Sequence, residues 1–198
     1  MTDKIAFFDF DGTITTRDTL LEFIKFSRGT TGFYTGFLLN MPWLFAYKLK
    51  IISNQRAKEA VLRFFYRKMP AKSFEEYCTC FAEQKLPGLI RTKAAKEINR
   101  LQEQGYDIVI VSASPGDWIT PWAATIGATL IATRLAIDDK GRLTGKINGK
   151  NCYGEEKVNR IRLEFRLEDY RSIYTYGDTK GDLPMLRLGH HSFMKPFR

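Results

Sequence analysis

The chain has 198 residues, of which 44% are apolar, and it carries a formal net charge of +9. This length allows one domain, or one domain with an inserted subdomain, and the apolar content excludes a disordered chain. The three cysteines, Cys78, Cys80 and Cys152, form no C-x-x-C pair, which argues against a disulfide framework or a zinc site. We expect reduced thiols in a cytoplasmic protein, and no signal peptide, because the apolar start runs straight into acidic residues.

The positive charge is concentrated in one segment. Between Lys48 and Lys72 eight basic side chains stand against the single acid Glu59, which leaves +7 in this segment. One interpretation is attraction of an anionic partner, such as a phosphorylated substrate, an acidic membrane surface or nucleic acid. The other interpretation is a solvated helical face, and the sequence leaves both open.

The first predicted element is a buried strand at residues 4–8. The apolar run ends at Asp9, Asp11 and Gly12, which is typical of a strand of a parallel sheet with ligand groups at its carboxyl end. Side chains two apart on a strand point the same way, so both carboxylates should face one crevice. Two carboxylates this close favour a hard dication such as Mg²⁺. The alternative is an acidic turn that caps a helix.

The segment 17–86 predicts helices without any strand. A capping box at Thr19–Glu22 should open a helix that ends near Arg28, where Gly29 and Gly32 break it. Further helices are expected near 33–50, 54–68 and 73–85. The apolar stretch 33–52 is too short and too interrupted for a membrane-spanning helix.

Beyond Pro87-Gly88 the pattern alternates between strands and helices. The expected elements are helices over 89–104, from Ser114-Pro115 onward and over 154–167, strands at 107–111, 129–134 and 172–176, and a hairpin of 135–137 and 143–147 at the sheet edge. This alternation predicts an α/β protein with a doubly wound, Rossmann-like parallel sheet. Trp118 and Trp122 are expected in packing, and residues 195–198 are expected to be frayed.

Four sequence motifs together resemble the haloacid dehalogenase superfamily, in its phosphoserine-phosphatase-like branch. They are FDFDGT at 8–13, IVIVSAS at 108–114, the lysine in YGEEKV at 153–158, and YGDTKGD at 176–182, in the order in which the family has them. The resemblance implies a core domain of residues 1–16 and 87–198 and an all-helical cap domain of residues 17–86.

The resemblance also implies roles for the acidic residues. Asp9 would be the nucleophile that forms an aspartyl-phosphate, and Asp11 would protonate the leaving oxygen and later act as base toward water. Mg²⁺ would be held by Asp9, the backbone carbonyl of Asp11 and Asp178, with Asp182 in support. Taken alone, Asp178 could be an ordinary turn acid and Asp182 a helix cap.

Other residues of the motifs would bind the substrate. The resemblance gives this role to Gly12, Thr13, Ser112, Ala113 and Lys157, with Ser112 and Lys157 on the phosphoryl oxygens. Such groups suit phosphoryl transfer, which depends on positioning and on neutralising oxygen charge. Alone, Ser112 would be a turn residue and Lys157 a solvated lysine.

Departures from the branch bear on the substrate. Asp18 stands where phosphoserine phosphatases have a glutamate, Ala113-Ser114 replaces the usual Gly-Gly, and the cap is rich in Phe, Leu and Trp. The main prediction is therefore a Mg²⁺-dependent phosphomonoesterase that acts on a small phosphorylated metabolite.

Three alternatives remain. One is a lipid-phosphate phosphatase similar to the bacterial enzymes for phosphatidylglycerophosphate, with a basic amphipathic helix containing Phe37 and Trp43 on an anionic membrane. In that case the competing interpretation is that these residues form the core of the cap. The second alternative is a regulatory phospho-acceptor that does not turn over. The third is a nucleic-acid binder, which we do not expect, because no recognised binding motif is present.

Overall fold

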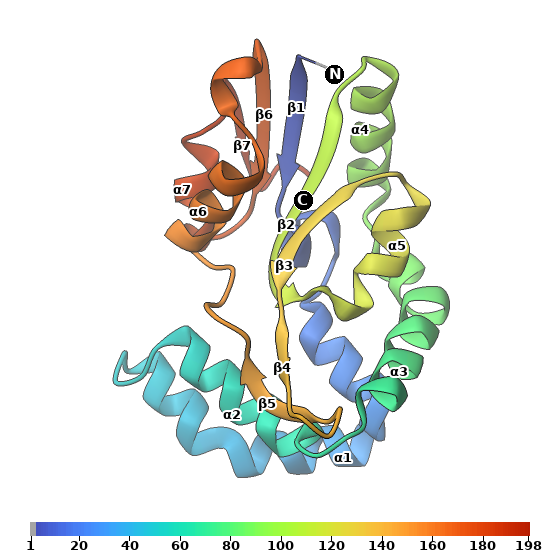
Figure 1. Ribbon diagram of the computed structural model, residues 1–198, viewed down its shortest axis with the longest axis vertical. Coiled ribbons are helices and arrows are strands. Elements are labelled where there is room, and N and C mark those ends of the chain that lie inside the picture. Colours follow the sequence, from blue (N-terminus) through green and yellow to red (C-terminus); the bar gives the residue numbers. More distant parts are fainter. Residues whose placement is uncertain (1–2) are drawn as a thin grey trace.

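The computed structural model describes residues 3–198, and a five-stranded parallel sheet forms its centre (Figure 1). In order across the sheet, the strands are β3 (Thr129–Thr133), β2 (Asp107–Pro115), β1 (Lys4–Phe8), β6 (Ser172–Gly177) and β7 (His191–Met194). The register places Phe8 beside both Ile110 and Tyr176. The carboxyl ends of the three inner strands therefore lie together.

Helices cover both faces of the sheet. On one face lie α4 (Thr92–Glu103) and α5 (Thr120–Thr125), and on the other lie α6 (Glu155–Glu164) and α7 (Leu183–Leu186). Because side chains alternate along a strand, Ala6 and Phe8 enter the first apolar cluster, whereas Ile5 and Phe7 enter the second. The predicted doubly wound α/β fold is confirmed.

Three further helices, called the cap helices below after the predicted cap segment, form a layer beyond the carboxyl ends of the strands: α1 (Thr19–Lys48), α2 (Asn54–Tyr66) and α3 (Ala71–Gln84). Gly29 interrupts α1 with φ of 71° and ψ of 169°, a conformation that glycine adopts without a steric penalty. The predicted break at Gly29 is confirmed, but Gly32 lies within the helix, so the prediction of a break there is wrong.

The start of α1 also differs from the prediction. Asp18 is the N-cap, and its carboxylate accepts a hydrogen bond from the Leu21 backbone N–H at 3.2 Å. The Thr19 hydroxyl donates instead to Asp11. The predicted capping box at Thr19–Glu22 is therefore wrong, because Asp18 caps the helix and the Thr19 hydroxyl donates to the Asp11 carboxylate, which lies outside the helix.

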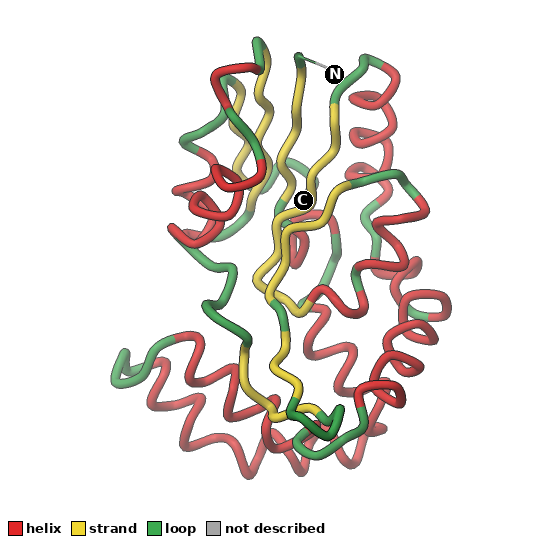
Figure 2. The backbone as a smooth tube through the Cα atoms, viewed as in Figure 1, coloured by secondary structure: helices red, strands yellow, loops and turns green. Residues whose placement is uncertain are grey.

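A two-stranded hairpin of β4 (Leu135–Ile137) and β5 (Leu143–Ile147) extends from β3 toward the cap helices (Figure 2). The hairpin lies against α2 so closely that a Cβ on Gly145 would meet the Arg63 Cα at 2.3 Å. The backbone N–H of Ile147 donates to Glu59 of α2 at 3.1 Å. The hairpin, which the predicted limits assign to the core domain, thus packs on a cap helix.

The cap and the core meet in a cluster of aromatic side chains. Phe23 of α1 stacks on Trp118 with a ring separation of 4.5 Å, and the Trp118 indole N–H donates to the Thr19 hydroxyl at 3.0 Å. Trp122 lies on Phe10 with a ring separation of 5.5 Å. The expectation that both tryptophans serve packing is confirmed.

Two segments differ from the sequence prediction. Strand β2 continues through Ser114 to Pro115, with a register shift against β3, and the next α-helix begins only at Thr120. A helix start at Ser114 was therefore a wrong prediction. Strand β7 was not predicted, and the tail that follows it is docked, because Phe197 is buried and stacks over Phe8.

Candidate active site

Asp9 follows β1 directly and lies against Lys157. Its backbone N–H donates to the Tyr176 carbonyl at 2.8 Å, which fixes it at the end of β1. Lys157, on the first turn of α6, is 1% exposed, and its ammonium lies 2.6 Å from Asp9 Oδ1. Burial raises the pKa of Asp9 to about 7, although the Lys157 ammonium acts in the opposite direction.

The other two acids of the group come from the loop after β6. Asp182 Oδ1 accepts from the Lys157 ammonium at 2.7 Å, and its Oδ2 accepts from the backbone N–H and the hydroxyl of Thr179. Burial alone would raise the pKa of Asp182, but Lys157 and the hydrogen bonds from Thr179 together outweigh burial and lower it. Asp182 therefore stabilises the loop after β6 through Thr179 and positions the Lys157 ammonium.

Burial alone would lower the pKa of Lys157, but the carboxylates of Asp9 and Asp182 outweigh burial and raise it. The lysine is thus held in its charged form. An ammonium has three donors, and Asp9 and Asp182 use two of them. The third can reach an oxygen of a ligand.

The donor set of this group fits a divalent cation. Asp9, Asp178 and Asp182 each offer a carboxylate oxygen, and the three oxygens lie within 4.8 Å of one another. Among residues 3–198, Lys157 pairs with Asp9 and Asp182, and the half-exposed Arg198 pairs with Asp178 Oδ2, so two cations face three buried carboxylates. Burial and the nearby Asp182 raise the pKa of Asp178, and its buried Oδ1 is without a hydrogen-bond partner in the described part of the chain. An oxygen-binding dication would relieve both the charge excess and the orphaned oxygen.

Asp11 lies on the cap side of the group. Its Oδ1 accepts from the backbone N–H and the hydroxyl of Thr19, both at 2.6 Å. Its Oδ2 accepts from the Ser112 hydroxyl at 3.3 Å. The carboxylate of Asp11 is therefore held between the start of α1 and the end of β2, apart from the three acids that could hold a metal.

The remaining predicted residues lie in the turns around Asp9. The Thr13 hydroxyl donates to Asp9 Oδ2 at 2.9 Å, which orients the carboxylate. Gly12 has φ of 82°, and a Cβ there would lie 2.5 Å from Asp178 Oδ2, so only glycine leaves room for that acid. Ser112 accepts from the Ser114 backbone N–H at 3.0 Å. The structure thus brings all nine predicted residues, Asp9, Asp11, Gly12, Thr13, Ser112, Ala113, Lys157, Asp178 and Asp182, around the ends of β1, β2 and β6.

Sequence reasoning missed Lys58, a cap residue that reaches the core. Its ammonium donates to the Ala113 carbonyl at 2.7 Å and to Asn151 Oδ1 at 3.2 Å. Burial lowers the pKa of Lys58, against the opposing effect of Asp11 and Asp18. The sequence did contain a sign of this position. Lys58 precedes the apolar residues Val61 and Leu62 by three and four positions, which places it on the same, buried face of α2.

Asp18 is the second cap residue near this position. The surrounding protein and the Asp11 carboxylate raise its pKa, while solvent, which reaches its side chain, limits the rise. Lys58 is among the groups that favour the charged form of Asp18. The cap therefore brings one acidic residue, Asp18, and one basic residue, Lys58, close to Asp11.

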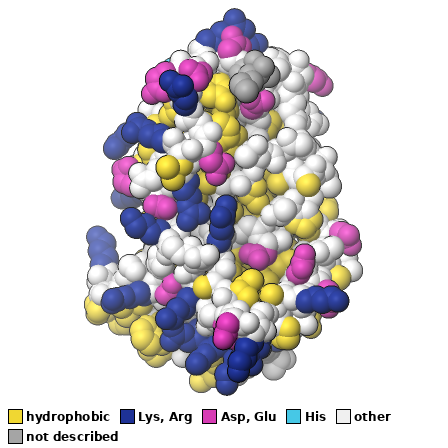
Figure 3. Space-filling model, in the orientation of Figure 1, with side chains coloured by type: hydrophobic (Ala, Val, Ile, Leu, Met, Phe, Trp, Pro, Cys, Tyr) yellow, Lys and Arg dark blue, Asp and Glu magenta, His cyan; other side chains and the backbone are white. Residues whose placement is uncertain are grey.

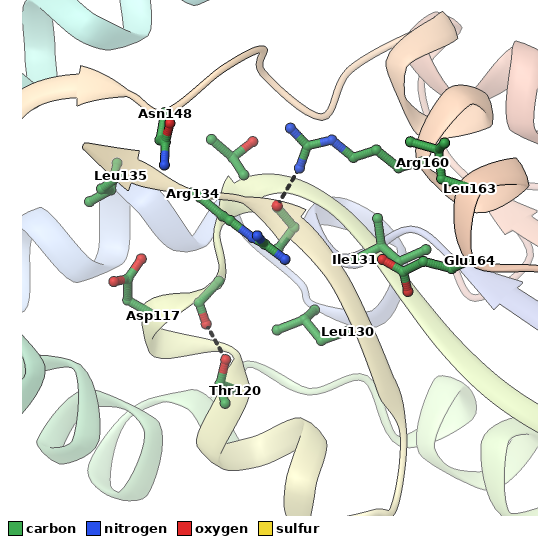
Figure 4. A pocket seen from close by; sticks show the side chains of 13 residues that line it. Asp117, Thr120, Leu130, Ile131, Arg134, Leu135, Asn148, Arg160, Leu163 and Glu164 are labelled. Atoms are coloured by element: carbon green, nitrogen blue, oxygen red, sulfur yellow. Dashed lines mark hydrogen bonds between the residues drawn. The ribbon is translucent and has the colours of Figure 1, made fainter. Parts of the chain in front are cut away.

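A cavity of about 710 Å³ lies elsewhere, along the outer edge of β3 (Figure 4). Arg160 and Glu164 of α6 and Asp117 point toward it, and the Arg160 guanidinium donates to the Ala132 carbonyl at 2.6 Å. None of the nine predicted site residues lines this cavity, so its size does not mark the chemical site.

Comparison with known proteins agrees with the motifs. The family model for haloacid dehalogenase-like hydrolases matches residues 6–187. Protein CicA of Caulobacter vibrioides is 36% identical over 192 residues, which cover 96% of this chain and 85% of that protein. A probable phosphatase of Mycobacterium tuberculosis is 40% identical over 114 residues, which cover 56% of this chain and 39% of that protein.

Solved structures share the fold. A Bordetella pertussis protein of unknown function has a TM-score of 0.80 at 22% identity, covering 96% of this chain and 88% of that one. A substrate-bound phosphoserine phosphatase has a TM-score of 0.61 at 18% identity, covering 96% and 84%. The predicted branch and the predicted enzyme class, a phosphoric monoester hydrolase, agree with these matches. The chain belongs to the haloacid dehalogenase-like hydrolases.

Proposed function

We propose that the protein hydrolyses a phosphate monoester in two steps at Asp9. An oxygen of Asp9 attacks phosphorus, and the bond from phosphorus to the leaving oxygen breaks while Asp11 gives that oxygen a proton. Asp11 then takes a proton from water, whose oxygen attacks phosphorus and releases inorganic phosphate and free Asp9. The observation that carries the proposal is the placement of Asp9 between Lys157 and Thr13, with Asp11 held separately on the cap side.

We propose Mg²⁺ as the cation for Asp9, Asp178 and the backbone carbonyl of Asp11, with Asp182 in support. The orphaned Asp178 oxygen and the excess of buried carboxylates support this assignment. When bound, the ion neutralises charge on the phosphoryl oxygens and on the acids around Asp9. The free donor of Lys157 would bind a phosphoryl oxygen, and Ser112 would hold another.

The substrate class that we propose is a small phosphorylated metabolite. Lys58 and Asp18 offer charges of opposite sign on the cap side of Asp11, which suits a polar organic part rather than an apolar one. A lipid phosphate remains the second candidate, because the cap also carries the exposed apolar residues described below.

The test is hydrolysis of an aryl phosphate with Mg²⁺ or with excess chelator. We expect metal-dependent release of phosphate, and we expect Asp9→Asn to lower kcat by about 10⁴-fold or more, because the nucleophile is lost. Asp139→Asn is the matched control, since Asp139 is an exposed aspartate in the turn of the hairpin. Its kcat should equal that of the unmodified protein.

Two results would contradict the proposal. Turnover by Asp9→Asn at the unmodified rate would remove Asp9 from the nucleophile role. A protein that becomes labelled by a phosphoryl donor at Asp9 and keeps the label without releasing phosphate would be a phospho-acceptor rather than a phosphatase.

A further inference from the structure

We propose that the outer face of the cap docks on the surface of a membrane that contains anionic lipids. The outer cap face is defined by the exposed apolar residues of the second half of α1, the loop after it, and one residue of α2. They are Tyr34, Leu38, Leu39, Met41, Trp43, Phe45, Tyr47, Leu49, Ile51 and Phe64. Their number and proximity in the chain distinguish them from the scattered apolar residues that any protein surface carries.

The exposure of these residues is fixed by how α1 packs. Where α1 meets α2, Gly36 lies so close that a Cβ there would be 2.1 Å from the Phe65 ring, and Asn40 is buried. Phe37 packs inward as well. The helix therefore cannot rotate to bury Leu38, which is 66% exposed, or Phe45, which is 62% exposed. Of the two residues for which the sequence left the core of the cap and a membrane-facing surface open, Phe37 packs in the core and Trp43 lies at the surface.

The composition of this part of α1 suits an apolar surrounding. From residue 29 to residue 47 the sequence has no acidic or basic side chain. Tyr34, Trp43 and Tyr47 combine an apolar ring with a polar group, which is the kind of side chain that gathers at a membrane–water interface. No helix among residues 3–198 is long and apolar enough to cross a membrane.

Basic side chains border the outer cap face. Lys48 ends α1 and Lys50 follows it, and Arg56 and Arg63 belong to α2. Figure 3 shows apolar side chains along the lower left edge of the molecule, with lysine and arginine side chains directly beside them. The one acid of this segment, Glu59, accepts a hydrogen bond from the Ile147 N–H of the hairpin, and four basic side chains of the border outnumber it. The border is therefore strongly cationic.

A groove connects the apolar and the basic parts. It measures about 540 Å³, and Leu39, Trp43 and Phe64 line it together with two basic residues, Arg56 and Arg63, and one acid, Glu59. Apolar walls next to two guanidinium groups match a lipid, whose acyl chain and phosphate have the same arrangement of apolar and anionic parts.

An exposed apolar surface can bind a second copy of the chain or a membrane, and the charge of its border distinguishes between them. In a symmetric dimer of this chain the same face would meet itself, and the basic border would oppose a second basic border. An anionic bilayer presents the opposite charge and also accepts the apolar side chains. Lys58 lies on the inner side of the same helix α2, so docking through the outer cap face does not involve it.

Vesicle flotation of the purified full chain tests the proposal without any substrate. We expect at least about tenfold more protein bound to vesicles of phosphatidylcholine with phosphatidylglycerol than to phosphatidylcholine alone, and a loss of binding at high salt. The double variant Leu38→Glu/Phe45→Glu should bind about tenfold less or weaker still, because two carboxylates enter the apolar contact. Since neither residue contacts the active site, hydrolysis of a soluble aryl phosphate should not change.

The matched control is Leu163→Glu. Leu163 of α6 is 85% exposed, lines the cavity beside β3 and is not part of the outer cap face, so Leu163→Glu should leave vesicle binding as it is. Equal binding to both vesicle types would overturn the anionic part of the proposal. No vesicle binding, or a dimer in sedimentation that Leu38→Glu/Phe45→Glu dissolves, would overturn it entirely. Vesicle binding by a protein that proves inactive would uphold this proposal and contradict the proposed function alone.

Discussion

The two halves of α1 have similar apolar content and very different surroundings. Before the kink at Gly29, Phe23 and Ile24 are completely buried between the cap and the core. After the kink, Leu38 and Phe45 lie at the surface, although the helix buries Gly36 and Asn40 on its other side. Apolar side chains in one helix thus stabilise the fold in one half and remain available for a partner in the other. The neighbours of a helix decide this, and its hydrophobicity does not.

The largest expected effect is on the buried half. Phe23→Ala should lower the free energy of unfolding by about 3–5 kcal/mol, because it leaves a cavity under Trp118 and removes three other aromatic contacts. Phe45→Ala is the control in the exposed half, and we expect a change within about 0.5 kcal/mol. Urea unfolding measures both. Equal losses for the two variants would mean that the outer half of α1 is buried in solution.

An intermediate effect is expected where the exposed half is anchored. Gly36→Ala should cost about 1–3 kcal/mol, because its methyl group would overlap the Phe65 ring. Gly32→Ala, one turn earlier, meets only the Arg28 Cβ at 3.3 Å and should be neutral or stabilise by up to about 1 kcal/mol. Thermal unfolding distinguishes the two. A tolerated Gly36→Ala would show that α1 and α2 separate easily, and the orientation of the outer cap face would then not be fixed.

The smallest expected effect separates the two sides of α2. Lys58→Met should raise KM for a phosphorylated metabolite about tenfold with little change in kcat, because in the proposed function Lys58, which lies at Ala113, contacts the organic part of the substrate. Arg56→Met, two residues away and exposed, should leave KM unchanged.

The pH dependence of KM checks the same assignment. Lys58 is charged below its pKa, and burial lowers that pKa, so KM should rise with increasing pH at a lower pH than an ordinary lysine would cause. Lys58→Arg should remove this rise, because arginine stays charged. An identical pH profile for the unmodified enzyme and the Lys58→Arg variant would exclude the contact.

The sheet and most of the site could be predicted because local patterns encode them. The strand at 4–8 and the hairpin at 135–137 and 143–147 have the predicted limits. Asp9 and Asp178 directly follow inner parallel strands, and Ser112 lies within the last residues of the third, so their meeting was a consequence of the topology alone. The chemical roles assigned to them remain predictions that the experiments above test.

The errors of prediction arose where tertiary contacts overrule a local signal. Ser114 and Pro115 have the sequence of a helix start, but pairing with β3 keeps them in strand β2. Lys58 was one of eight basic residues in its segment, and only the packing of α2 against the core sets it apart. Strand β7 is short and exposed, so its sequence carries no apolar alternation.

The position of β1 in the sheet also determines the order in which the protein can fold. Strand β1 comes first in the chain, yet its two neighbours begin at Asp107 and Ser172. During synthesis the apolar β1 therefore emerges long before β6, while the contacts between α1 and α2 are local and can form early. Asp9 precedes Lys157 by 148 residues, and Asp178 and Asp182 come later still. A ribosome-bound intermediate would thus carry contacts between α1 and α2 and an apolar central strand whose pairing is complete only after β6 has been made.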